Sequence, residues 1–132
     1  MPLQRIDPAP HVPDPPPYSV WSGKYLCAQG VAAVELHVEA APDGSATATF
    51  EFGPHDENPN PIARGSYELT GAMFIDDKGV LQLKLVPDHW IDQPPSYVMI
   101  GFYAASSDPV QRTMKGKIEH SSCDWIEITR TR

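Results

Sequence analysis

Hydrophobic and polar residues alternate with a period of two along most of the chain from Val20 onward. This alternation is typical of β-strands that have one buried and one exposed face. It predicts about eight strands, of which residues 66–75 and 96–103 are the most apolar on both faces. The predicted strands lie near residues 21–29, 34–38, 46–52, 66–75, 81–85, 96–103, 114–118 and 126–128.

Turn residues separate most of these strands by hairpin-length loops, as in Pro42–Gly44, Asp76–Gly79 and Ser106–Pro109. Residues 53–65 and 87–95 are longer links that are rich in proline, and we expect a short helical turn in the second. Short loops between successive strands favour an all-β fold, an antiparallel up-and-down β-barrel of about eight strands. A two-sheet β-sandwich is the alternative architecture.

The distribution of proline divides the chain into two parts. Seven of the 15 prolines fall within the first 17 residues, so residues 1–19 are interpreted as a Pro-rich arm and residues 20–132 as the barrel domain. We expect the arm to bind a protein partner or a second copy of the chain. Polyproline segments dock into aromatic grooves, which makes the region around Trp90 and Tyr97 the expected docking surface.

Charge and hydropathy exclude several kinds of partner. The net charge of −7 and the lack of a basic stripe argue against binding nucleic acid or an anionic membrane surface. No apolar run approaches the ~20 residues that a membrane-spanning helix needs. The first residues also lack the apolar core of a secretory signal. We therefore expect a cytoplasmic protein whose cysteines are reduced.

The two cysteines, Cys27 and Cys123, admit three interpretations. Cys27 falls on the first strand and Cys123 just before the last, and these strands are neighbours in a closed barrel, so a disulfide is compatible with this fold. His120 and Cys123 have a spacing suitable for two ligands of one metal ion, but no complete ligand set is evident. Buried free thiols with a structural role are the favoured interpretation, and no metal site or cofactor is expected.

The largest aromatic concentration lies in residues 90–103 and suggests a surface that binds a ligand or partner. The candidate residues are Trp90, Tyr97, Phe102 and Tyr103, together with Tyr18 at the end of the arm. Packing in the barrel core and mouth is the simpler alternative. No nucleophile motif or phosphate loop is present, and the histidines near carboxylates in residues 55–58 and 88–92 are interpreted as solvated loops. No catalytic residue is assigned, and we expect no enzyme activity.

Trp21 in "VWSGKY", at the start of the first strand, and Arg130 or Arg132 in "WIEITRTR", at the end of the last, form a pattern of their own. This arrangement resembles the calycin superfamily, which comprises lipocalins, fatty-acid-binding proteins and avidins. The resemblance implies that Trp21 closes one end of the barrel and that the arginine stacks across it in a cation–π contact. Trp21 and Arg130 are therefore assigned structural roles.

Three hypotheses for the function follow. The first is a non-catalytic interaction module that binds a protein partner or itself. The second is a carrier of a small apolar ligand inside the barrel. The third is a small barrel enzyme, which would need polar groups that converge on its interior. A packed interior favours the first hypothesis and a hollow apolar interior favours the second.

Overall fold

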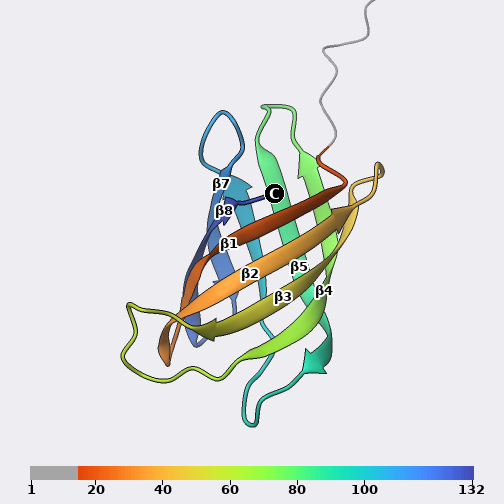
Figure 1. The fold of residues 1–132 in the computed structure, drawn as a ribbon. Coiled ribbons are helices and arrows are strands. Elements are labelled where there is room, and N and C mark those ends of the chain that lie inside the picture. The colour runs from red at the N-terminus through yellow and green to blue at the C-terminus, as the bar shows by residue number, and fades with distance from the viewer. Residues whose placement is uncertain (1–14) are drawn as a thin grey trace, which may run out of the picture.

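The computed structural model describes residues 15–132, which form a closed β-barrel of eight antiparallel strands (Figure 1). Each strand pairs with the next one in the chain, and the last strand returns to pair with the first. The strands are β1 (Tyr18–Cys27), β2 (Gly30–Ala40), β3 (Ser45–Pro54), β4 (Gly65–Ile75), β5 (Leu81–Asp92), β6 (Gly101–Ser106), β7 (Thr113–Glu119) and β8 (Cys123–Arg130). Residues 15–132 contain no helix long and apolar enough to cross a membrane.

The predicted all-β up-and-down barrel is confirmed, and pairing between β1 and β8 excludes the two-sheet sandwich. This pairing places Trp21 opposite Arg130 and Cys27 opposite Cys123. Closure leaves no strand with an unpaired edge along its whole length, which protects the protein from edge-to-edge association. β1 begins at Tyr18, so Tyr18 and Ser19 belong to the barrel and not to the arm.

Two boundaries around residues 87–103 differ from the prediction. β5 continues through Pro87 to Asp92, where a link with a helical turn was expected. Pairing of β5 with β6 involves only residues 82–85, so Pro87 lies where β5 has β4 as its partner and its other edge is free. Proline is tolerated at such an edge because its missing N–H is not needed there. Residues 96–100, predicted as strand, form a loop in which Ser96 has a φ of 68°.

The interior of the barrel is packed at the end where β1 begins. Trp21 is fully buried there, and its indole nitrogen donates a hydrogen bond to Ser19 Oγ at 2.9 Å. Aliphatic side chains, themselves fully buried, complete this half of the core. They include Leu36, Met73, Leu81, Leu83, Met114 and Ile128.

Close approach between neighbouring strands requires glycine at Gly116 on β7. A Cβ atom at this position would overlap the backbone carbonyl oxygen of Tyr103 on β6. Gly71 on β4 faces the carbonyl of Lys84 on β5 in the same way. Both residues allow the strands of this small barrel to bend and coil tightly.

Candidate functional site

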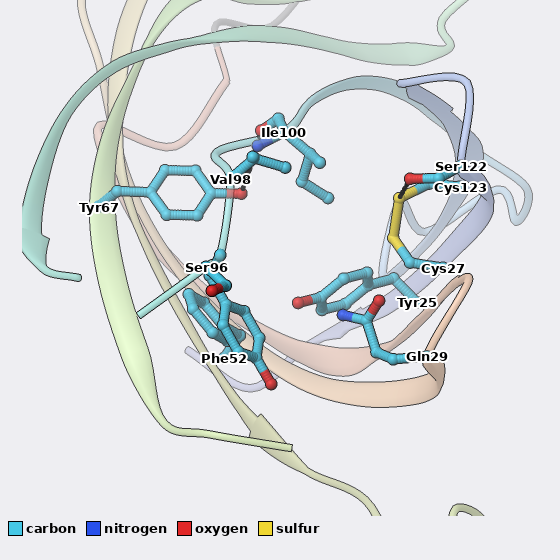
Figure 2. A pocket seen from close by; sticks show the side chains of 11 residues that line it. Tyr25, Cys27, Gln29, Phe52, Tyr67, Ser96, Val98, Ile100, Ser122 and Cys123 are labelled. Atoms are coloured by element: carbon cyan, nitrogen blue, oxygen red, sulfur yellow. Dashed lines mark hydrogen bonds between the residues drawn. A yellow bond between two sulfur atoms is a disulfide. The ribbon is translucent and has the colours of Figure 1, made fainter. Parts of the chain in front are cut away.

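The opposite end of the barrel contains a pocket of about 320 Å³ (Figure 2). It lies where the turns after β1, β5 and β7 meet, far from Trp21 along the barrel axis. Side chains from β1, β3 and β4 form its walls, and the loop between β5 and β6 contributes to its rim. The pocket is lined by Tyr25, Cys27, Gln29, Phe52, Tyr67, Ser96, Tyr97, Val98, Ile100, Ser122 and Cys123.

Aromatic rings in mutual contact build one side of the pocket. Phe50 lies deeper in the barrel, between Tyr25 at a centroid distance of 5.3 Å and Tyr67 at 4.9 Å. Nearer the rim, Phe52 stacks on Tyr97 at 5.5 Å. Trp90 packs edge-on against Tyr67 at 5.2 Å and supports this group from β5. Contacts of this kind hold the rings in fixed positions, so the apolar wall is formed before any ligand arrives.

Two tyrosine hydroxyls in this region have different hydrogen-bonding states. Tyr67 donates to the carbonyl oxygen of Ile100 and accepts from the amide of the same residue, both at 3.1 Å. Tyr25 as a whole residue is only 4% exposed, but its hydroxyl is open to the pocket and makes no hydrogen bond within residues 15–132. Figure 2 shows its oxygen directed into the pocket. A hydroxyl that opens into a pocket in this way is available to hydrogen-bond a water molecule or a ligand.

Burial also makes these two hydroxyl groups harder to ionise. It raises the pKa of Tyr25 well above its usual value, and the nearby Tyr97 adds to this effect. Burial raises the pKa of Tyr67 as well, although the hydrogen bond with the Ile100 backbone opposes the shift. Both residues therefore remain neutral hydroxyls at physiological pH, and Tyr25 can donate or accept a hydrogen bond. They are poorly suited to act as general bases.

Hydrogen bonds connect the loops around the rim. The Tyr97 hydroxyl accepts a hydrogen bond from the amide of Ala63 at 2.9 Å, which joins the β5–β6 loop to the β3–β4 loop. The side-chain amide of Asn58 donates to the carbonyl oxygens of Gln29 and Val31 at 2.9 and 3.0 Å. The β3–β4 loop is thus tied to the other two segments, and the rim is a connected structure.

Cys27 and Cys123 form a disulfide on one wall of the pocket. The favoured expectation of two free thiols is therefore wrong, and Cys123 is not available as a metal ligand beside His120. The strand register explains the outcome, because Cys27 and Cys123 are directly paired between β1 and β8 with a Cα–Cα distance of 3.8 Å. The sequence pattern predicted that the first and last strands are neighbours, but it did not predict which residues pair between them.

The structure places the five predicted aromatic residues in five different places. Tyr97 lines the pocket, and Trp90 packs behind it against Phe52 and Tyr67. Phe102 is fully buried in the core. Tyr103 is exposed on the outer wall of β6, and Tyr18 lies near the opposite end of the barrel, where its hydroxyl contacts His37.

The prediction did not single out Tyr25, Phe52 and Tyr67, which line the pocket. All three follow the same period-two alternation as the core residues. Their aromatic character was visible in the sequence, but the end of the barrel at which each one lies depends on strand register. That information comes only from the three-dimensional structure.

The residues that carry the calycin resemblance lie side by side at the packed end. Trp21 and Arg130 are paired between β1 and β8. The Arg130 guanidinium, however, donates through Nε to the carbonyl oxygen of Arg132 at 3.0 Å. Within residues 15–132, the cation–π contact found is that of Lys24 with Trp125 at 6.0 Å, and none is found between an arginine and Trp21.

The Pro-rich arm lies largely outside the described residues, so its predicted docking surface stays a prediction. Its last residues leave the barrel at the packed end, where the carbonyl oxygen of Pro17 accepts a hydrogen bond from the amide of Ala40. Tyr97 lies near the start of β2 and Ala40 at its end. About ten residues of strand at roughly 3.3 Å each separate these two places.

Fold and pocket together define a closed, eight-stranded up-and-down β-barrel that is packed at one end and hollow at the other. Comparison with protein-family models, curated protein sequences and solved structures found no significant match to the chain.

Proposed function

We propose that the protein is a calycin-like carrier that binds a small, neutral and mainly apolar ligand in the pocket at the open end of its barrel. The Tyr25 hydroxyl, which opens into an aromatic-lined pocket, is the observation that carries this proposal. This observation favours a carrier over a protein-interaction module. In such a module, the Pro-rich arm would have to supply the contacts with the partner. The absence of enzyme activity remains an expectation.

The lining of the pocket indicates the chemistry of the ligand. Its walls are aromatic and aliphatic, and no Lys, Arg, Asp, Glu or His from residues 15–132 lines it. A charged ligand would lose its hydration without gaining an ion pair, so a neutral ligand is favoured. Gln29, Ser96 and Ser122 at the rim offer polar contacts to a part of the ligand that remains near solvent.

The volume limits the size of the ligand. About 320 Å³ is near the lower end of the range of small-molecule sites, which is roughly 300–1,000 Å³. This space holds about ten water molecules at the density of liquid water, because each one occupies about 30 Å³. A compound of one or two rings with a single hydroxyl or carbonyl group fits both the volume and the Tyr25 hydroxyl.

The disulfide bears on where such a carrier would work. Disulfides persist in oxidising compartments and are rare in the cytosol. We therefore replace the expected cytoplasmic location with an oxidising environment as our proposal.

The test is a titration of the full chain with naphthalene and 2-naphthol, followed by amide chemical shifts in NMR spectra. We expect saturable shifts at the pocket residues and tighter binding of 2-naphthol. Tyr25→Phe removes only the hydroxyl and should weaken 2-naphthol about 2- to 13-fold, the equivalent of one hydrogen bond of about 0.5–1.5 kcal/mol. Naphthalene binding should change little.

Tyr18→Phe is the matched control, because Tyr18 lies near the packed end of the barrel. It should leave both affinities unchanged. Shifts that map to the outer wall, or a loss of affinity that is equal for Tyr18→Phe and Tyr25→Phe, would contradict the proposal.

A further inference from the structure

Three side chains with metal-binding groups converge on the outer wall of the barrel, away from the pocket. Glu35 and His37 lie two residues apart on β2, and Glu51 on β3 is paired directly with Glu35. His37 Nε2 is 3.3 Å from Glu35 Oε2 and 3.5 Å from Glu51 Oε1. One ligand atom from each residue lies within 4.8 Å of the other two.

Two features of this cluster favour the binding of a cation. Glu35 and Glu51 are like charges directly opposite each other on antiparallel strands, a destabilising arrangement. His37 Nε2 is buried and makes no hydrogen bond within the part of the chain that the structure describes, although two carboxylates are close to it. The protein thus holds a ring nitrogen and two carboxylate oxygens together without satisfying the nitrogen.

The other ring nitrogen of His37 has a defined partner. Nδ1 lies 2.9 Å from the hydroxyl of Tyr18 on β1. When Nδ1 carries the proton and donates a hydrogen bond to the Tyr18 hydroxyl, Nε2 has a free lone pair, which points toward the carboxylates. Histidines that ligate metals commonly have this arrangement, in which an outer partner fixes the ring and its tautomer.

We infer that Glu35, His37 and Glu51 form a binding site for a divalent transition metal ion of the zinc class. Zinc binds imidazole and carboxylate ligands at about 2.0–2.2 Å in tetrahedral geometry. Two ligand atoms about 2.05 Å from a tetrahedral centre are about 3.3 Å apart. The distances of 3.3 and 3.5 Å from Nε2 to the two oxygens are close to this value.

Three protein ligands leave the fourth position of the ion for water or another small ligand. The glutamate side chains are about half exposed, at 48% and 50%, so this position is open to solvent. Calcium and magnesium prefer sites made of oxygen atoms, whereas the imidazole favours zinc and its neighbours. A surface cluster of ion pairs is the alternative explanation, and it makes no prediction of metal affinity.

The test is isothermal titration calorimetry of the metal-free full chain with zinc chloride, in the presence of excess magnesium. We expect one site that magnesium does not block. His37→Gln should weaken zinc binding more than about 100-fold, since it removes a ligand, and Tyr18→Phe about 10-fold, since it removes the outer partner. Glu35→Gln and Glu51→Gln should each weaken binding and provide further variants if His37→Gln does not fold.

His89→Gln is the matched control, because His89 is an exposed histidine beside a carboxylate, Asp88, at 3.0 Å. It should retain the zinc affinity of the unmodified chain. Three results would overturn the inference. These are an absence of zinc binding, unchanged binding by His37→Gln, and equal weakening by His37→Gln and His89→Gln.

Discussion

Loss of the disulfide between Cys27 and Cys123 should lower the stability of the barrel by several kcal/mol. The two residues are 96 positions apart, so the bond closes a loop that contains most of the folded domain. A cross-link that closes a loop of about 100 residues lowers the entropy of the unfolded chain by the equivalent of about 4.7 kcal/mol at 25 °C. Measured effects are often smaller, so we expect a loss of about 3–5 kcal/mol.

This loss is a large part of the total stability of a small domain, which is typically about 5–15 kcal/mol. Urea denaturation followed by tryptophan fluorescence would compare the oxidised protein, the reduced protein and the double variant Cys27→Ala/Cys123→Ala. The reduced protein and the double variant should unfold at lower urea. Their dependence on urea should be steeper, because an unfolded chain without the cross-link exposes more surface.

The double variant is also the control for the reductant, which should not change its unfolding curve. Labelling of the denatured, unreduced protein with an alkylating reagent should find no free thiol. A stability loss under about 1 kcal/mol would refute the entropic argument. Rapid labelling of both cysteines in the unreduced protein would refute the disulfide itself.

Other predictions concern single side chains. Trp21→Ala should cost about 3–5 kcal/mol in urea denaturation because it empties the packed end, and a loss under about 1 kcal/mol would show that Trp21 is not a core residue. Gly116→Ala should cost about 1–3 kcal/mol, because its Cβ would overlap backbone atoms of β6. Gly53→Ala meets only the Arg64 side chain, at 3.2 Å, and should change stability by less than about 0.5 kcal/mol; equal effects of the two substitutions would contradict the packing argument. The pKa of Asp108 is lowered by hydrogen bonds from backbone amides, that of Thr113 first, so its contribution to stability is complete above about pH 4 and is lost as the pH falls through the lowered pKa. Thermal unfolding between pH 2 and 7 should show that Asp108→Asn destabilises the protein at neutral pH and not in acid, and a difference independent of pH would contradict this assignment.

The alternation of hydrophobic and polar residues was sufficient to predict the barrel, because each side chain of a barrel strand faces either the core or the solvent. This prediction fails where a strand is hydrogen-bonded to a neighbouring strand on one side only. Residues 87–95 were expected to form a link, but β5 continues through Pro87, which is tolerated because β5 has a free edge at this point. Residues 96–100 are apolar because Ile100 and Met99 pack against the core from a loop, and not because they pair in a sheet.

The candidate site was less predictable than the fold, since it depends on register between residues distant in sequence. The sequence alone does not show that Tyr25 lines the pocket whereas Trp21 lies at the packed end, because both side chains face inward on β1. The group formed by Glu35, His37 and Glu51 was hidden for the same reason. Two of its members alternate outward on β2, and only the pairing of β2 with β3 brings Glu51 to them.

The inward residues differ between the two ends of the barrel, and this difference is consistent with the position of the pocket at the end opposite Trp21. The packed end places an indole and several long aliphatic side chains in one cross-section. At the other end, the inward side chains that line the pocket include Tyr25, Phe52 and Tyr67, and the disulfide lies on another wall. The two cysteines there share one covalent bond and occupy less space than two separate side chains. The aromatic rings contact one another along one side, so the volume between them and the disulfide remains open beside the Tyr25 hydroxyl.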